Sequence, residues 1–314
     1  MPHCAVDHKS PEVIDPSGAH ASSCSGSAKT RYGAHQAFSR ALQRLSAKAG
    51  FASAHEPTAK ALLGDRFTED QCRGLFPKQS SGASRSIADD LKRDLDAFFD
   101  PRADDATRCL AQDSMRKTLE RIPPKTEMLR IDCSLTDTRS AAELWVDVNY
   151  THGSCASYRE GQLSFHLASL QAEREQPFRA PKHLPELVSP ALQKAVAAKE
   201  AKYLPLVTLA NLQQAHRQRA TVPRFFAACV THAGEFSPAV FALIEAVCVG
   251  FKQSFDAAFP RSFISKPQAV AGFRSALKDS VIMCLVSGFG KQLRTSGFPR
   301  PCDVRPLNRF SSLL

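Results

Sequence analysis

The spacing of hydrophobic residues changes several times along the chain, and each change predicts a different element. Apolar residues recur at the helical intervals of three and four in four segments, 34–49, 189–217, 237–259 and 267–286. Short apolar or alternating runs, typical of strands, occupy 51–56, 129–135, 144–150 and 225–231. Taken in order, the helix, strand, hairpin, helix, strand and helix predict an α/β fold.

Polar and turn-forming residues divide this pattern into segments. Residues 64–84 have the composition of a loop, and two charged helices at 85–99 and 103–121 are predicted to form an exposed helical hairpin. The predicted divisions are a leader rich in Cys and His (1–33), a first helix and strand (34–57), a loop and helical insertion (58–128), a core (129–260) and a C-terminal helix with an irregular tail (261–314).

Each strand of the predicted hairpin carries one aspartate. A turn over 136–143 is compatible with a register that pairs Leu135 with Leu144, and this register sets Asp132 opposite Asp147. Like charges on directly opposed strand positions repel each other, so this placement indicates a cation between them. Aspartate oxygens suit Mg²⁺ or Mn²⁺, which also coordinate phosphate oxygens. The alternative is that both aspartates are ordinary residues on a solvated strand face.

The helix that follows the predicted hairpin carries a lysine on its apolar stripe. Lys199 lies on the same side as Val196 and Tyr203. Lys194 falls on the opposite, solvated side, and Lys202 lies at the edge of the stripe. A lysine at the centre of an apolar stripe either extends its ammonium group to solvent or meets an anion. In the second case, Lys199 is aimed at the two carboxylates and at a bound phosphate.

Other side chains are candidate metal ligands. Glu56 ends the apolar stretch after the first helix, where a further carboxylate would complete a metal shell. In the leader, His20 and Cys24 have zinc-ligand spacing, and Cys4 lies upstream of them. The alternative is that these are ordinary loop residues. His35 opens the first predicted helix and is interpreted as a cap-region histidine.

Composition narrows the class of protein. The formal charge is +10, and the pI near 9.2 favours an anionic partner. Ten scattered cysteines without a C-x-x-C pair do not form the framework of a small secreted protein, which indicates an intracellular chain. Neither an uninterrupted apolar run long enough for a membrane span nor a signal peptide is present in the sequence.

These motifs, in this order, resemble the restriction-enzyme-like endonuclease region of non-LTR retrotransposon polyproteins, which belongs to the PD-(D/E)XK nuclease superfamily. The resemblance covers most of the chain. The segments that carry it are the Cys/His leader, the helix from His35 to Leu45, Glu56-Pro57, Arg130-Ile131-Asp132 in place of Arg-Pro-Asp, the strand 144–148, Lys199-x-x-Lys202-Tyr203, and the strand and turn over 225–234.

The resemblance implies a restriction-endonuclease-like core, a mixed sheet flanked by helices. It implies a nuclear, Mg²⁺-dependent (or Mn²⁺-dependent) enzyme that nicks chromosomal DNA to prime reverse transcription, with the element's RNA as a further partner and Zn²⁺ in the leader. Asp132 and Asp147 would bind the metal, and Lys199 or Lys202 would replace the superfamily's strand lysine, because Asn149 occupies that strand position. The implied catalytic set is Glu56, Asp132, Asp147, Lys199, Lys202 and Tyr203.

Other functions are compatible with the same sequence. Residues 58–128 exceed the usual link of the family, the first knuckle cysteine is missing and no polymerase precedes Met1, which favours a detached or decayed copy. A non-catalytic nucleic-acid-binding module would retain the basic surface, including Arg217, Arg219 and Arg224. A protein-interaction remnant is the third alternative.

Overall fold

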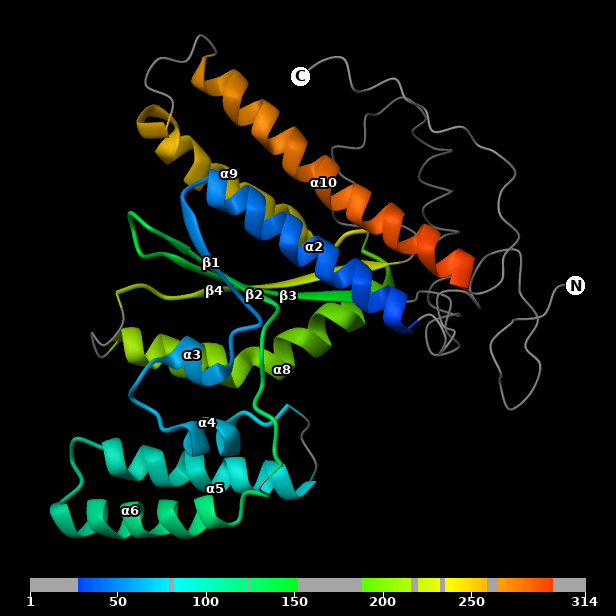
Figure 1. Cartoon of the computed structure of the whole chain (residues 1–314). Coiled ribbons are helices and arrows are strands. Elements are labelled where there is room, and N and C mark those ends of the chain that lie inside the picture. The colour runs from blue at the N-terminus through cyan, green and yellow to red at the C-terminus, as the bar shows by residue number, and fades with distance from the viewer. Residues whose placement is uncertain are drawn as a thin grey trace, which may run out of the picture.

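The computed structural model describes residues 28–78, 82–123, 125–151, 188–215, 220–231, 235–258 and 265–295 (Figure 1). The helices are α2 (Ala28–Lys48), α3 (Ala59–Leu63), α4 (Glu69–Leu75), α5 (Gly82–Phe99), α6 (Asp105–Glu120), α8 (Pro190–Ala215), α9 (Pro238–Ala258) and α10 (Lys266–Thr295). The strands are β1 (Phe51–His55), β2 (Cys133–Asp137), β3 (Glu143–Thr151) and β4 (Arg224–Thr231).

The four strands form one mixed sheet in the order β1-β2-β3-β4. The β1–β2 and β2–β3 pairs are antiparallel, and the β3–β4 pair is parallel. A parallel pair needs a crossover connection, and α8 lies in that connection. Leu135 pairs with Leu144, so the register predicted from the turn is confirmed. The predicted α/β class is confirmed as a mixed sheet flanked by helices.

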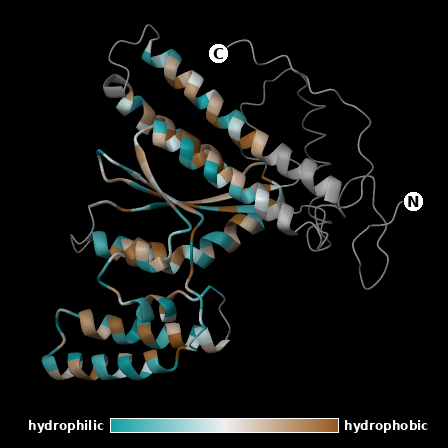
Figure 2. Cartoon of the chain, in the orientation of Figure 1, coloured by the Kyte–Doolittle hydropathy of each residue, from teal (hydrophilic) through white to brown (hydrophobic). Residues whose placement is uncertain are grey.

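Helices cover both faces of the sheet: α2, α9 and α10 lie over one face, and α8 lies over the other (Figure 1). Alternate residues of β3 therefore enter two different cores. Leu144, Val146 and Val148 pack beneath α2, α9 and α10, whereas Trp145 packs in the core that contains Tyr203 of α8. The alternative in which both aspartates lie on a solvated strand face is wrong for Asp147, because α8 covers that face and Asp147 is buried. Along β2 and β3, hydrophobic residues alternate with more polar ones (Figure 2).

Three predicted boundaries are corrected, and one of them is the end of the last helix, because α10 continues past the expected residue 286 to Thr295. The helix α2 begins at Ala28, six residues before the expected start, so His35 lies inside it and does not cap it. The strand expected over 129–135 joins the sheet at Cys133. The residues just before Cys133 are extended but pair elsewhere: the backbone N–H groups of Leu129 and Ile131 donate to the carbonyls of Phe76 and Pro57. These residues therefore alternate with the period of a strand but are not part of the sheet.

Between β1 and β2, the described residues form the helices α3, α4, α5 and α6. The hairpin of α5 and α6 was predicted, but α4 lies where a loop was expected. Short helices leave little periodicity, and their main signals are caps. Thr58 caps α3, while Thr68 and Gln71 form a capping box at the start of α4.

Helix α9 is strongly apolar because it packs in the core. Residues Pro238–Phe255 are long and apolar enough to cross a membrane, the one such helix among the described residues, and 44% of the stretch is buried inside the protein. Its buried residues include Leu243 and Val247. Gly250 allows a close approach to β1, since a Cβ there would lie 2.3 Å from Cε2 of Phe51. The expectation of no membrane span stays a prediction.

Candidate active site

The two aspartates predicted to face each other are brought together where β2 begins. Asp132 directly precedes β2, and extending the observed register by one residue sets it opposite Asp147 in the middle of β3. The backbone N–H of Val148 donates a hydrogen bond of 2.5 Å to Oδ2 of Asp132, which holds this carboxylate against β3. The predicted juxtaposition is therefore present.

Asp147 is a buried carboxylate with polar partners from α8. Its side chain is 4% exposed, and Nζ of Lys199 lies 2.5 Å from Oδ2. The hydroxyl of Tyr203 lies 2.6 Å from Oδ1. Burial raises the pKa of Asp147, and repulsion by Asp132 raises it further, while Lys199 and Tyr203 act in the opposite direction without cancelling the increase. The carboxylate therefore gains from any additional positive charge beside it.

The hydroxyl of Tyr203 links Asp147 to the chain before β2. It lies 2.6 Å from Oδ1 of Asp147 and 2.8 Å from the carbonyl oxygen of Arg130, and its single hydrogen serves one acceptor at a time. Burial, and then the charge of Asp147, raise the pKa of Tyr203, so the hydroxyl stays protonated and remains a donor.

The Tyr203→Phe substitution is expected to lower the free energy of unfolding by about 1–3 kcal/mol, because it leaves buried acceptors without their donor. Tyr150→Phe is the matched control, since the buried Tyr150 hydroxyl has no hydrogen-bond partner among the described residues. This control should not lower the free energy of unfolding, because it removes a buried hydroxyl that makes no hydrogen bond there. Urea unfolding measures both variants, and equal losses would contradict the assigned role of the Tyr203 hydroxyl.

His35 is a site residue that the sequence interpretation missed. From the interior of α2, its Nε2 lies 2.8 Å from Oδ2 of Asp132. Burial lowers the pKa of His35, but the hydrogen bond to Asp132 and the charges of Asp132 and Asp147 outweigh it, so the pKa is raised overall. A signal was available, because His35 stands three residues before Phe38 and hence on the side of α2 that faces the core.

Glu56 lies at the same corner of the sheet, directly after β1. Its backbone N–H donates to the carbonyl of Asp132 at 3.0 Å. Its Oε1 accepts a hydrogen bond of 2.9 Å from Nε2 of Gln36, the neighbour of His35. Glu56 has a positive φ of 46°, a conformation that side chains other than glycine rarely adopt. The fold therefore holds this carboxylate beside the N-terminal half of α2, one residue along the helix from the partner of Asp132.

The three lysines of α8 have different environments. Lys199 pairs with Asp147, as expected for a lysine aimed at the carboxylates, and Lys194 is exposed. Nζ of Lys202 lies 3.4 Å from the hydroxyl of Tyr203 and 4.9 Å from the centre of its ring. Burial, and then the charge of Lys199, lower the pKa of Lys202. Lys202 therefore lies at the outer edge of the site.

No family model, curated protein or solved structure matches this chain. The functional proposal consequently depends on the residues of the site themselves.

The donor set is compatible with a divalent cation bound partly by other ligands. Among the described residues, no group of three or more His, Cys, Asp or Glu side chains is arranged to hold a metal ion. Mg²⁺, however, is commonly held by one or two carboxylates together with waters and substrate phosphates. Asp132 and Asp147 supply two carboxylates, and the buried Oδ2 of Asp147 accepts no regular hydrogen bond although Lys199 lies close to it. The pair therefore fits Mg²⁺ or Mn²⁺.

Several predicted residues lie outside the described residues. They are the candidate zinc ligands Cys4, His20 and Cys24 and the basic residues Arg217 and Arg219. Arg224 is described: it begins β4, is exposed, and its Cζ lies 5.1 Å from the centre of the Phe226 ring. Its role in binding nucleic acid stays a prediction.

Proposed function

We propose that this protein is a metal-dependent DNA endonuclease whose active site contains Asp132, Asp147 and Lys199. The observation that carries the proposal is the buried carboxylate of Asp147, which lies beside a second carboxylate and 2.5 Å from the ammonium group of Lys199. Such an arrangement of opposed charges, in a chain with a net charge of +10, suits a phosphate with its cation.

Each residue has a specific role in this proposal. Asp132 and Asp147 would hold Mg²⁺ or Mn²⁺, which when bound lowers the pKa of a coordinated water and stabilises charge on the phosphate. Tyr203 fixes the carboxylate of Asp147, and His35 fixes that of Asp132. The ammonium group of Lys199 would bind a non-bridging oxygen of the scissile phosphate, as a compact cation does.

The fold supports the proposal in coarse terms, since the observed sheet is mixed and flanked by helices, which is compatible with the architecture that the retrotransposon nuclease resemblance implies. In the full proposal, the chain acts in the nucleus as a restriction-endonuclease-like domain, nicks chromosomal DNA to prime reverse transcription, contacts the element's RNA and binds Zn²⁺ through its leader. Glu56 and Lys202 complete the proposed catalytic set.

A plasmid assay tests the endonuclease proposal. With Mg²⁺ or Mn²⁺, the protein should convert supercoiled plasmid to nicked circles, and EDTA should stop it. Asp132→Asn should slow nicking by at least about 100-fold, because a lost metal ligand removes several kcal/mol of transition-state stabilisation. Asp113→Asn, on the exposed side of α6, is the matched control and should nick at the wild-type rate. If Asp132→Asn nicked plasmid as fast as the wild type, the endonuclease proposal would be wrong.

A second candidate function is a non-catalytic nucleic-acid-binding module. One observation favours it: His35 and Lys199 already lie against the two carboxylates, so their charges are balanced by the protein itself. Under this alternative, DNA binds and the affinity falls steeply as salt rises, but no nicking occurs with either cation.

A further inference from the structure

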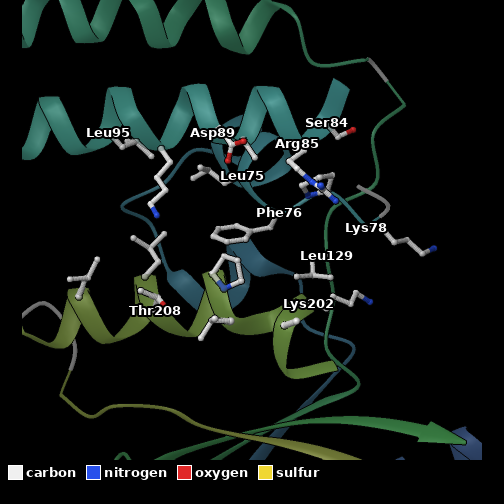
Figure 3. A pocket seen from close by; sticks show the side chains of 18 of the residues that line it. Leu75, Phe76, Lys78, Ser84, Arg85, Asp89, Leu95, Leu129, Lys202 and Thr208 are labelled. Atoms are coloured by element: carbon white, nitrogen blue, oxygen red, sulfur yellow. The ribbon is translucent and has the colours of Figure 1, made fainter. Parts of the chain in front are cut away.

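A groove of about 700 Å³ lies between α8 on one side and α4 and α5 on the other (Figure 3). This volume falls within the range of roughly 300–1,000 Å³ that is usual for ligand sites. The groove is formed by the insertion between β1 and β2 together with the helix that carries Lys199. It is a site distinct from the Asp132–Asp147 pair.

The rim of the groove is basic. One face of α5 lines it, with Arg85 and Lys92 among residues at helical spacing. Neither side chain has an ion-pair partner among the part of the chain that the structure describes. Lys202 adds a third cation against the two carboxylates of the lining, Asp89 and Asp96, whereas Lys78 also lines the groove but pairs with Glu127 at 2.5 Å. The balance of lining charges is therefore positive, which favours an anion.

The floor of the groove is apolar and contains an aromatic ring. Phe76 lies at its centre, between α5 and α8, and Leu129 lies beside it (Figure 3). Pro205 of α8 also lines the groove, and its missing N–H cannot donate to the carbonyl of Ala201, another lining residue. Exposed leucines in the lining (Leu204, 61%, and Leu212, 49%) and a cationic rim together suit a nucleotide, whose base packs against the apolar side chains while its phosphate meets the cations.

The groove adjoins the candidate active site through Lys202. This residue lines the groove, while its Nζ lies 3.4 Å from the hydroxyl of Tyr203, which in turn contacts Asp147. Arg85, Lys78 and Lys202 lie toward the same end of the groove, whereas Thr208 lies toward the other (Figure 3). A strand whose phosphate reached Asp147 would thus continue past Lys202 into the groove.

We propose that this groove binds an unpaired segment of the substrate DNA strand, beside the scissile phosphate. The bases pack against Leu204 and Leu212, and the phosphates contact Arg85, Lys92 and Lys202. A single strand suits the groove better than a duplex, because only unpaired bases can turn a face toward the apolar side chains. This proposal rests on the proposed nuclease function, because that function identifies the bound strand as substrate DNA.

Binding is measured apart from cleavage, by fluorescence anisotropy of a labelled single-stranded DNA 15-mer in EDTA. The double variant Arg85→Ala/Lys92→Ala should weaken binding roughly tenfold at 0.1 M salt and reduce the salt slope by about 1.4, as expected for two lost phosphate contacts to a single strand. The control Arg93→Ala/Lys117→Ala removes the same charge from exposed positions of the same hairpin outside the groove. It should change affinity less than twofold.

A substitution that keeps the charge distinguishes binding inside the groove from binding to the charges on its rim. Thr208→Trp places a large side chain in the lining and should weaken single-strand binding at least fivefold while duplex of the same length binds as before. Thermal unfolding confirms that each variant is folded. The proposed binding of DNA in the groove would be contradicted if both double variants weakened binding equally, or if Thr208→Trp bound single strands as the wild type does. It would also be contradicted if RNA of the same sequence bound more than tenfold tighter than DNA. Cleavage without groove-dependent binding rejects only this inference, and groove-dependent binding without cleavage rejects only the nuclease.

Discussion

Plasmid nicking by the Asp147→Asn variant is expected to fall by at least about 1,000-fold, without loss of folding stability. Asparagine keeps the shape of the side chain and an acceptor for the hydroxyl of Tyr203, but it has no charge to hold a cation. Burial and the neighbouring Asp132 raise the pKa of Asp147, so the ionised carboxylate opposes folding despite its contact with Lys199. The residue proposed to matter most for cleavage is thus one that the fold does not need.

The pH dependence of the free energy of unfolding tests whether the ionised carboxylate of Asp147 opposes folding. The folded-state pKa of Asp147 lies above its ordinary value of 3.8, so the native state retains a proton that the unfolded chain has released. The contribution of Asp147 is therefore most favourable below the ordinary value and is lost as pH rises through the raised pKa. Asparagine has no such titration. The stability of Asp147→Asn relative to the wild type should consequently increase with pH across this window.

Asp137, at the other end of β2, is a matched control of opposite sign. Burial acts to raise its pKa, but hydrogen bonds from Arg139 and Ser140 outweigh burial and lower the pKa overall. Asp137→Asn should therefore lower stability near neutral pH and still nick DNA. Urea unfolding in EDTA from pH 4 to 9 compares the two variants. If Asp147→Asn lost as much stability as Asp137→Asn, Asp147 would be a structural ion-pair partner and the proposed site would be wrong.

The pairing of the hairpin was predictable because turn length and alternation constrain it together. A turn after Leu135 and the apolar alternation on both sides leave few registers, and the observed one sets Asp132 opposite Asp147. The position of Lys199 on α8 was predictable for a similar reason, since helical spacing alone separates it from the exposed Lys194. Local periodicity therefore predicted the three central residues of the candidate site.

The burial of Asp147 could not be predicted locally. Its alternation with apolar residues is the same whether its face meets solvent or another helix, and the covering helix α8 is distant in sequence. The contact of His35 with Asp132 depends likewise on two segments far apart in the chain. The groove beside Phe76 required the positions of α4 and α5 over α8, and the short α4 was itself missed. Tertiary contacts decided each of these features.

The Lys199→Met variant is expected to lose both cleavage and stability, and to recover stability when Mg²⁺ is added. Nζ of Lys199 lies 2.5 Å from Oδ2 of Asp147, and the lysine side chain is 22% exposed. Removing the ammonium group leaves a buried carboxylate next to Asp132. This should lower the free energy of unfolding at pH 8 by roughly 1–3 kcal/mol, below the usual cost for fully buried pairs because solvent reaches the lysine. Nicking should fall by at least about 100-fold.

Recovery by Mg²⁺ separates a metal site from a simple ion pair. A ligand that binds only the folded state stabilises it in proportion to the logarithm of ligand concentration over Kd. Two carboxylates without their ammonium partner should bind Mg²⁺ more tightly, so the unfolding midpoint of Lys199→Met should rise more with Mg²⁺ than that of the wild type. Lys194→Met, on the exposed side of the same helix, should respond as the wild type does. If Mg²⁺ stabilised neither Lys199→Met nor the wild type, the carboxylates would have no affinity for a cation, and a binding module would be the better account of this fold.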